Sequence, residues 1–373
     1  MMRRLRNRAG VLAATLLVMM TAGSAAGAAY QATLLSSPGA NGAAAYGVSG
    51  TSIVGNSYPD AILWNGATNA FVSLNPGPEW SSFAYAVDGN HQAGYGWTTT
   101  NADSHALLWN GTAASYVDLN PAGFYSSQAY GVSGNAQVGG GGLITNPSGG
   151  GGHALLWHGS AASAVDLHPA GYAGSVAAAV FGDNIVGTAR QSNFGGYDQA
   201  VLWTGPSHTL TTLHPAGFAA SSARGVSQDS QVGRGFVSSP FGGDRHALLW
   251  HGSAASVIDL NPSGFNRTEA VGVAGMKQVG FGQGSATGGN DHALLWQGTA
   301  ASVFDLHSLL VGLGPAFITS EAQSIDASGV IVGFASDGQT SYAVKWSPVP
   351  EPTALALIVT GLLAAGGIRR RSR

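Results

Sequence analysis

The stretch that decides the fold reads His105-Ala-Leu-Leu-Trp-Asn-Gly-Thr-Ala-Ala-Ser-Tyr-Val-Asp-Leu-Asn-Pro-Ala-Gly-Phe124, and variants of it return between residues 60 and 348. The tryptophan that ends each His-Ala-Leu-Leu-Trp run marks the copies: Trp64, Trp109, Trp157, Trp203, Trp250, Trp296 and Trp346. Successive markers stand between 45 and 50 residues apart. Seven copies at that period indicate a propeller or a solenoid.

Each copy contains four short runs that are typical of β-strands. The third copy shows them in order as Ala129-Tyr-Gly-Val-Ser-Gly-Asn-Ala-Gln-Val-Gly139, a variable loop, His153-Ala-Leu-Leu-Trp157 and Ala164-Val-Asp-Leu167. Side chains alternate along a strand, so His, Leu and Trp of the third run take one face, while Ala and the other Leu take the opposite face. Both faces carry apolar groups, as expected for a sheet that packs between two similar sheets.

A histidine and an aspartate recur 13 residues apart across the third and fourth runs. An antiparallel hairpin would set them directly opposite each other, within reach of a cross-strand hydrogen bond. The pairs are His105 with Asp118, His153 with Asp166, His246 with Asp259, and His292 with Asp305. Equivalent residues of different blades cannot converge on one ion, so this pattern predicts structural pairs and no metal site.

The two ends of the repeat region favour a propeller over an open solenoid. The last copy reaches Pro348 without a fourth strand, and the first is preceded by Gln31-Ala-Thr-Leu-Leu-Ser-Ser37, which reads as an orphan fourth strand. If this strand completes the last blade, the ring closes and leaves no long edge exposed. We therefore predict an all-β fold, a seven-bladed β-propeller of four-stranded blades closed by the N-terminal strand.

Composition agrees with such a fold and restricts the partners. The 373 residues are 45% apolar and 9% charged, with 57 glycines and no cysteine. Between residues 30 and 348 there are 7 basic and 17 acidic residues, a net charge of 7 − 17 = −10, and no Lys or Arg occurs from Tyr30 to Ala189. This charge argues against nucleic acid or an anionic membrane surface as a partner.

The N-terminus has the parts of a cleavable secretory signal. Residues 1–29 contain four arginines, an apolar run from Ala9 to Met20 and small residues before Tyr30. We expect a signal helix that uses general secretion; Arg3-Arg4 leaves the twin-arginine route open, and a retained membrane anchor is the weaker alternative. The expected domains are the signal peptide, 1–29, the propeller, 30–348, and a C-terminal sorting signal, 349–373.

The C-terminal segment has three parts: Val349-Pro-Glu-Pro352, an apolar run of 16 residues from Thr353 to Ile368, and an arginine-rich end. The run would rise about 24 Å as a helix, against a hydrocarbon core of roughly 30 Å. We expect it to form a transmembrane helix, with the arginines holding its end in the cytoplasm.

This tail resembles the sorting signal of PEP-CTERM proteins. The resemblance rests on Pro350, Glu351 and Pro352, the apolar run, and Arg369, Arg370 and Arg371. It implies recognition by an exosortase and export by a Gram-negative bacterium. The C-terminal helix would anchor the protein in the inner membrane before processing, and the protein would then reach the cell surface or the extracellular matrix.

The body resembles the HAF-type extracellular repeat. The matching residues are His246-Ala-Leu-Leu-Trp250, Asp259-Leu260, Ala270-Val-Gly-Val273 and Gln278-Val-Gly280. Leu stands where that repeat has Phe, and Asn-Pro-Ala-Gly replaces a Gly-rich loop. The resemblance implies an extracellular repeat protein of undetermined activity and assigns no catalytic residue.

The glutamates of the body are candidate catalytic residues. Hydrolysis of a glycoside needs two carboxyl groups across a cleft, and Glu79, Glu269 and Glu321 read as lying at unrelated repeat positions. No nucleophile elbow, phosphate loop or zinc spacing occurs. From the sequence we therefore predict no enzyme activity, no metal and no cofactor.

The variable loops between the second and third strands are the predicted binding surface, because function usually lies on loops held by a rigid scaffold. Aromatic side chains there would suit sugar stacking: Trp97, Phe194, Tyr197, Phe236 and Phe241. The expected function is a non-catalytic scaffold that binds exopolysaccharide in a biofilm. The alternatives are a passive surface protein without a specific ligand, and a polysaccharide hydrolase.

Overall fold

The computed structural model describes residues 30–37, 39, 42–145, 151–191, 196–238 and 243–349. The predicted signal peptide, 1–29, lies outside the described residues, as does the sorting tail from Pro350 through Arg369, Arg370 and Arg371. Phe194 and Phe241 of the predicted binding loops also lie outside them. Within the described ranges, no helix is long and apolar enough to cross a membrane.

Strands make up most of the described chain. Six sequence repeats contribute a first, second, third and fourth strand, and the last contributes the first three. The first strands are β2 (Ala44–Ser49), β6 (Trp80–Asp88), β10 (Phe124–Ser133), β14 (Tyr172–Phe181), β18 (Ala220–Val226), β22 (Phe265–Ala274) and β26 (Thr319–Ile325). The second strands are β3 (Ser52–Ser57), β7 (His91–Thr98), β11 (Ala136–Leu143), β15 (Asn184–Gln191), β19 (Gln231–Phe236), β23 (Lys277–Gly284) and β27 (Ile331–Ser336).

The third strands are β4 (Asp60–Asn65), β8 (His105–Asn110), β12 (His153–Trp157), β16 (Asp198–Thr204), β20 (Arg245–Trp250), β24 (His292–Trp296) and β28 (Ser341–Pro348). The short outer strands are β5 (Phe71–Ser73), β9 (Val117–Asp118), β13 (Val165–Asp166), β17 (Thr209–Thr212), β21 (Ile258–Asp259), β25 (Phe304–Asp305) and β1 (Tyr30–Leu34). Short 3-10 helices are η1 (Ala113–Ser115), η2 (Ala161–Ser163), η3 (Ala254–Ser256), η4 (Ser285–Thr287), η5 (Ala300–Ser302) and η6 (Leu306–Leu310).

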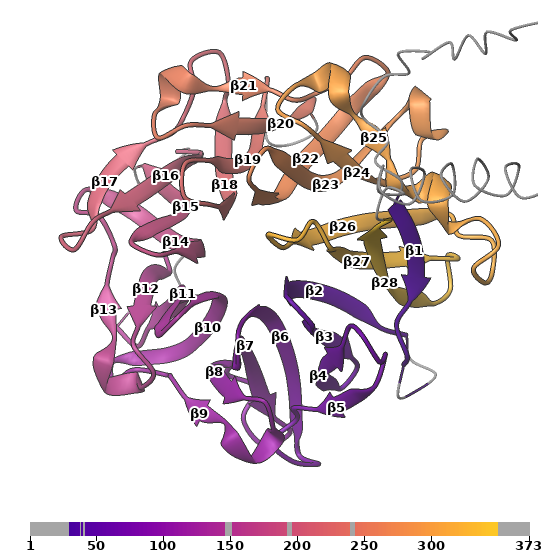
Figure 1. Cartoon of the computed structure of the whole chain (residues 1–373). Coiled ribbons are helices and arrows are strands. Elements are labelled where there is room, and N and C mark those ends of the chain that lie inside the picture. The colour runs from indigo at the N-terminus through magenta and orange to yellow at the C-terminus, as the bar shows by residue number, and fades with distance from the viewer. Residues whose placement is uncertain are drawn as a thin grey trace, which may run out of the picture.

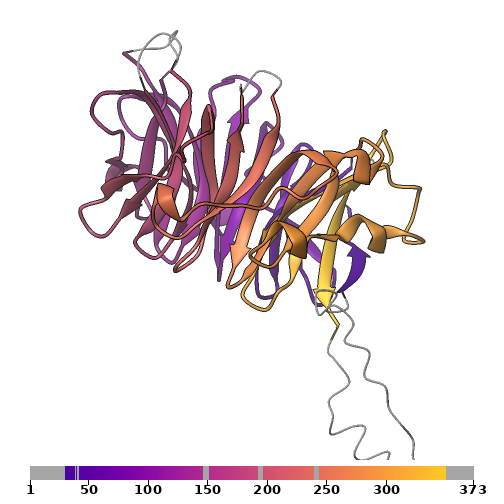
Figure 2. The ribbon, with the colours of Figure 1, turned by 90° about the horizontal axis from the view of Figure 1, so that it is seen from above.

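The strands form antiparallel sheets arranged around a common centre, as Figure 1 shows. Five sheets have four strands, and one has eight because a single parallel pair, Arg245 with Arg267, joins β18–β21 to β22–β25. In every repeat the first strand lies nearest the centre in Figure 1, and seen from the side in Figure 2 the strands run between the two faces of the molecule. The fold is thus an all-β propeller.

The N-terminal strand β1 pairs with β28 in a sheet of order β1-β28-β27-β26. Leu34 lies opposite Val344, and the amide of Leu35 donates to the carbonyl of Ala343 at 2.9 Å. The amide of Leu119 makes the equivalent bond to the carbonyl of Ala106 at 2.8 Å. The strand that comes first in the chain therefore occupies the fourth-strand position beside the last repeat.

A glycine at one position of every second strand allows the first two strands to approach closely. A Cβ atom on Gly139 would lie 1.9 Å from the carbonyl oxygen of Gln128, so any other residue would force the strands apart. The same clash would occur at each equivalent position: Gly55, Gly94, Gly187, Gly233, Gly280 and Gly333. This contact explains the Gly that ends the recurring Gln-Val-Gly run.

The core lies between neighbouring sheets and is built around the repeated tryptophans, which are at most 2% exposed. Trp157, for example, packs with Leu108 and Ala129, so its cluster joins residues of two successive repeats. Buried serines also link repeats: the amide of Ala106 donates to Oγ of Ser127 at 3.1 Å, and that hydroxyl donates to Oδ1 of Asn120 at 2.7 Å. These two hydrogen bonds therefore satisfy buried polar groups across the sheet boundary.

The hairpin of third and fourth strands has a different register from the predicted one. Asp118 pairs with Leu107, two residues beyond His105. The difference arises because residues Ala113–Ser115 form η1 inside the loop, where the sequence analysis expected a simple turn. The Asp118 carboxylate still reaches His105, as a diagonal neighbour across the two strands.

Candidate functional site

Every first strand contains a β-bulge at the same place. The register shifts lie between Ala45 and Gly47 in β2, and at the equivalent alanines of all the other first strands. Each shift leaves one residue without a partner in the ladder: Tyr46, Tyr85, Tyr130, Ala178, Arg224, Val271 and Gln323. Bulges redirect side chains, and all seven residues line one central cavity of about 1400 Å³.

One side of this central cavity is aromatic. The rings of Tyr46 and Tyr85 stack with centroids 5.0 Å apart, and Tyr130 meets Tyr85 edge-on at 5.8 Å. Tyr85 also stacks on Tyr95, whose ring lies 6.0 Å from that of Trp97. The aromatic column therefore runs along β6 and β7 from the cavity towards the loop that follows β7.

The hydroxyl groups of Tyr46, Tyr85 and Tyr130 stay protonated. Burial, with a smaller contribution from the neighbouring Tyr95, raises the pKa of Tyr46 and that of Tyr130 to about 12. The pKa of Tyr85 is raised further by the same causes. These side chains therefore offer neutral hydroxyl donors and flat apolar faces, which suit sugar rings and their hydroxyl groups.

The opposite side of the cavity carries what we call the arginine cluster, namely Arg224, Arg234 and Arg245 around Glu269. Arg224 Nε donates to Glu269 Oε1 at 3.1 Å, and Arg234 Nη1 donates to Oε2 at 2.8 Å. Arg245 Nη1 lies 3.3 Å from the same Oε2. Burial opposes ionisation of Glu269, but the three guanidinium charges outweigh it and hold the pKa of Glu269 below its usual value.

A second glutamate, Glu321 on β26, has the opposite electrostatic environment. Burial is the main cause, and the charges of Asp291 and Glu269 add to it, so that the pKa of Glu321 rises to about 7. Gln323, a cavity-lining bulge residue, donates to Glu321 Oε2 at 2.8 Å. Glu321 therefore lies beside the cavity wall as a carboxyl that exchanges its proton near neutral pH.

Asp291 supplies a further carboxylate beside Glu321. The amide of Ser320 donates to the backbone carbonyl of Asp291 at 2.9 Å, which brings the two acidic residues together. Oδ1 of Asp291 is buried and has no hydrogen-bond donor among the described residues. Two neighbouring carboxyl groups are the arrangement that acid–base catalysis of glycoside hydrolysis uses.

The expectation that the glutamates occupy unrelated repeat positions is wrong for two of them. Glu269 precedes the buried Ala270 and pairs with Phe281, just as Glu321 precedes Ala322 and pairs with Phe334. The equivalent residues in the other repeats are Ala44, Phe83, Gln128, Val176 and Ser222. Glu79 is exposed in the loop before β6 and belongs to no such position.

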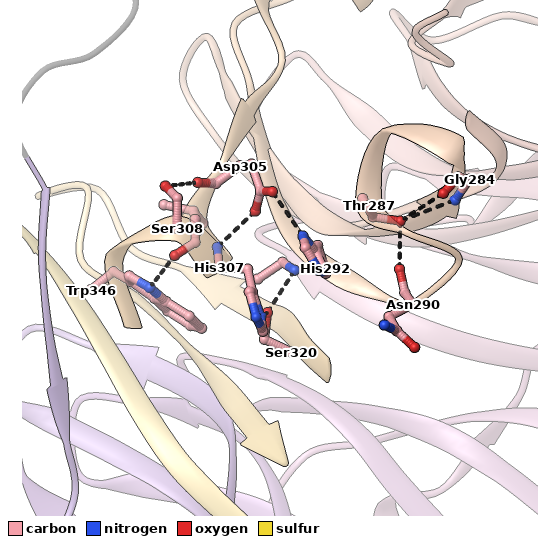
Figure 3. Close-up of polar contacts among 11 residues, drawn as sticks. Gly284, Thr287, Asn290, His292, Asp305, His307, Ser308, Ser320 and Trp346 are labelled. Carbon is pink, nitrogen blue, oxygen red and sulfur yellow. Dashed lines mark hydrogen bonds and ion pairs between the residues drawn. The ribbon is translucent and has the colours of Figure 1, made fainter. Parts of the chain in front are cut away.

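The repeated histidines lie on third strands, away from the cavity. His105 Nδ1 is 2.7 Å from Asp118 Oδ2, and the equivalent distances are 2.7 Å for His153 with Asp166, 2.6 Å for His246 with Asp259, and 2.8 Å for His292 with Asp305. Figure 3 shows the last pair, beside His307, which contacts Ser320 Oγ at 2.8 Å. Within the described ranges, no three His, Asp or Glu side chains are placed to share a metal ion.

A second histidine stacks on the first in two of the repeats. The rings of His153 and His168 lie 3.9 Å apart, and those of His292 and His307 lie 4.0 Å apart. Burial, and then the charge of the stacked neighbour, lower the pKa of His168 and of His307. The rings of His168 and His307 are therefore neutral near pH 7. Each of these rings links its hairpin to the following first strand.

The predicted binding-loop residues lie in separate places. Trp97 is half-buried and ends the aromatic column. Phe236 lies under the guanidinium of Arg234, with 5.4 Å between the guanidinium carbon and the ring centroid. Tyr197 is 41% exposed beside β16. The bulge residues, which sequence reasoning missed, converge on one cavity.

Comparisons with known proteins find matches in structure alone. Neither a protein-family model nor a curated protein sequence matches the chain. An oligogalacturonate lyase from Vibrio parahaemolyticus is 9% identical, with a TM-score of 0.53 over 87% of this chain and 97% of the lyase. A puromycin hydrolase is 14% identical, with a TM-score of 0.52 over 84% of this chain and 54% of the hydrolase.

The β-propeller domain of the Trilobed protease from Pyrococcus furiosus is 10% identical, with a TM-score of 0.48 over 82% of this chain and 94% of that domain. This chain spans about half the length of the matched puromycin hydrolase. At such identities the likeness concerns the fold, a β-propeller.

Two predictions need correction, namely that the protein is a non-catalytic scaffold and that it has no enzyme activity. The solved structures that the chain resembles include enzymes, namely an oligogalacturonate lyase and a puromycin hydrolase. The sequence argument against catalysis also rested on scattered glutamates, whereas Glu269 and Glu321 occupy equivalent positions beside one cavity. The premise of the scaffold prediction therefore fails.

Proposed function

We propose that this protein is a polysaccharide hydrolase whose active site is the central cavity, with Glu321 as the acid catalyst. The observation that carries the proposal is a carboxyl group with a pKa of about 7 that is hydrogen-bonded to the cavity-lining Gln323, in a cavity that stacked tyrosine rings also line. A catalytic acid works best when its pKa lies close to the operating pH. The tyrosines supply the aromatic faces and hydroxyl donors that sugar units need.

The reaction follows from the two neighbouring carboxyl groups. Glu321, protonated below about pH 7, gives its proton to the glycosidic oxygen as the bond to the sugar carbon breaks. Asp291 is the charge with the largest effect on Glu321, and we assign to its carboxylate the removal of a proton from the attacking water. The products are two hydroxyl-ended sugar chains, one with a new reducing end.

The architecture behind this proposal is a ring of seven four-stranded blades, closed by β1. Support comes from seven sequence repeats, from seven equivalent bulges and from the pairing of β1 with β28. In such a ring the first strands surround the axis, which explains why one residue from each lines the same cavity. Deleting residues 30–37 should markedly lower the melting temperature; an unchanged melting temperature would argue against closure by β1.

We further propose the cellular setting that the terminal segments imply. The segment 1–29 would direct export, and an exosortase would recognise Pro350-Glu351-Pro352 before the protein reaches the cell surface or the extracellular matrix. A hydrolase in that location would meet the exopolysaccharide of its own cell. Both segments lie outside the described residues, so this proposal rests on their sequence.

The test is cleavage of polysaccharides by the purified full chain, measured as new reducing ends. Glu321→Gln should reduce the rate at least about 100-fold, the usual contribution of general acid catalysis. Glu79→Gln is the matched control, because it makes the same chemical change at an exposed loop position. Equal rates for wild type and Glu321→Gln would refute the assignment, and unsaturated products without hydrolysis would identify a lyase instead.

A further inference from the structure

The two sides of the central cavity differ in charge. The body has seven Lys and Arg residues, all after Ala189, and the cavity-lining Arg224 and Arg234 are two of them. The equivalent bulge positions of the first three repeats carry Tyr46, Tyr85 and Tyr130. A molecule in the cavity can therefore contact aromatic rings on one side and guanidinium groups on the other. The cavity lining also includes four aspartates, namely Asp88, Asp198, Asp229 and Asp326.

The exposed donors of the arginine cluster point to an acidic ligand. Arg224 uses Nε for Glu269, and its two terminal nitrogens make no hydrogen bond within the part of the chain that the structure describes. The side chains of Arg224 and Arg234 are 43% and 23% exposed, while Glu269 is 5% exposed. Glu269 therefore holds the two arginines from behind, and their outer nitrogens remain available in the cavity.

The arginine cluster also has more positive charge than Glu269 can neutralise. Three guanidinium groups surround the Glu269 carboxylate, and the charge of Asp291 acts on one of them, Arg245. Arg245 is 8% exposed, and its Nε and Nη2 are buried without a hydrogen-bond partner among the described residues, as is Arg234 Nε. Buried donors of a charged group that lack a hydrogen-bond partner cost folding free energy. An anion that binds at this site should therefore gain more binding free energy than it would at an exposed arginine.

Aromatic rings hold two members of the arginine cluster in place. The guanidinium of Arg245 lies 5.3 Å from the ring centroid of Phe281, and that of Arg234 lies 5.4 Å from the centroid of Phe236. Such stacking fixes the plane of a guanidinium, and a fixed fork matches the two oxygens of a carboxylate. The geometry is thus suited to one planar anion, and the net charge of −10 for the body offers no general attraction to polyanions.

We propose that the arginine cluster binds the carboxylate of a uronic acid unit, so that the substrate is an acidic polysaccharide. Arg224 and Arg234 would hold the carboxylate while the tyrosines on the other side pack against neighbouring sugar rings. This proposal rests on the proposed function, because it places the uronic acid in the same cavity as Glu321. It adds the chemical group, a carboxylate on the sugar unit, by which the cavity would select its substrate.

The experiment compares each acidic oligosaccharide with its carboxyl-reduced form, in which the carboxylates have become primary alcohols. Oligomers of galacturonic acid and of glucuronic acid serve as probes, and calorimetry with the full chain measures the dissociation constants. Wild type should bind at least one acidic oligomer about 10- to 100-fold more tightly than its reduced form. Arg224→Gln should abolish that preference while leaving the affinity for the reduced form unchanged.

Two further variants separate charge from folding. Arg224→Lys keeps the charge but loses the fork, so it should retain only part of the preference. Lys345→Gln is the control, because Lys345 lies on β28 outside the cavity and donates to the carbonyl of Gly66. Circular dichroism of each variant shows whether it is folded.

The outcomes distinguish this proposal from the proposed function. Equal affinity of wild type for acidic and reduced oligomers, or an unchanged preference in folded Arg224→Gln, would overturn the uronic acid assignment. Cleavage of a neutral polysaccharide that is lost in Glu321→Gln would then still support the hydrolase. Preferential binding of the acidic oligomers without any cleavage would support the carboxylate site and refute the hydrolase.

Discussion

The outer hairpins and the inner bulges of the propeller have the same repeat period but opposite patterns of variation. In the outer hairpins, four repeats have the same His–Asp pair, with nearly equal distances. At the inner bulges, the seven equivalent residues include three tyrosines, an arginine and a glutamine. Uniform residues at one position indicate a role in each repeat, whereas diverse residues around one cavity indicate a role for the ring as a whole.

The largest expected effect concerns the close approach of the first and second strands, on which the outer hairpins and the inner bulges both depend. Gly139→Ala would place a Cβ atom 1.9 Å from the carbonyl oxygen of Gln128, and we expect it to cost more than about 4 kcal/mol of unfolding free energy. Denaturant unfolding measures this cost. The control is Gly134→Asn at φ 55°, where a Cβ atom has open space and the cost should stay below about 1 kcal/mol. Equal costs for both would mean that close strand approach is not the constraint.

The next largest effect is a loss of stability in the hydrophobic core between two repeats. Trp157 is fully buried against residues of the neighbouring sheet, and Trp157→Ala should cost roughly 3 to 5 kcal/mol through the cavity it leaves. Thermal and denaturant unfolding measure the cost. Trp97→Ala removes the same side chain from a half-buried place at the end of the aromatic column and should cost clearly less. The prediction fails if the two variants are equally destabilised.

A smaller effect depends on pH and belongs to the inner region alone. Because the pKa of Glu321 is raised from 4.5 to about 7, the folded state binds this proton more tightly than the unfolded chain does. Its contribution to stability is therefore complete below about pH 4.5 and is lost as the pH rises through about 7, on the order of 3 kcal/mol in total. Glu321→Gln should remove this dependence. Unfolding free energies at about pH 5 and about pH 8 test it, and parallel losses in both proteins would contradict it.

The smallest effect concerns the outer pairs. The side chains of His105 and Asp118 are 27% and 45% exposed, so Asp118→Asn should cost less than about 1 kcal/mol of unfolding free energy. Oligosaccharide cleavage should not change, because the pair lies outside the cavity. A double-mutant cycle with His105→Gln measures the coupling. A coupling above about 2 kcal/mol would give the outer pair a larger role than its exposure allows.

The repeated parts of the fold were accessible from sequence because each constraint recurs with the repeat. The tryptophans and the Gln-Val-Gly runs return with the period, and the same contacts follow in every sheet. The register of the hairpin was missed by two residues, since an Ala-Ala-Ser run such as Ala113–Ser115 forms a 3-10 turn without a distinctive sequence signal.

The candidate site was missed for a different reason. Alignment on the tryptophan run leaves the first strands unaligned, so Glu269 and Glu321 read as unrelated. A signal was present, because each precedes an alanine followed by a bulge, as Gln128 precedes Ala129. The raised pKa of Glu321 could not have been read from the chain, since it depends on burial and on the charge of Asp291, which reaches it only through the fold.

The bulges also have a consequence for how such a protein could change its specificity. A bulge residue has no partner in the ladder, so its replacement removes no strand pairing and leaves the buried alanine and glycine beside it untouched. The bulge positions of the cavity wall can therefore change without altering the strand frame, and only residues in contact, such as Tyr46 and Tyr85, would be coupled. Selection, in nature or in a combinatorial library, can exchange one side chain per repeat and alter what the cavity accepts while the ring stays folded.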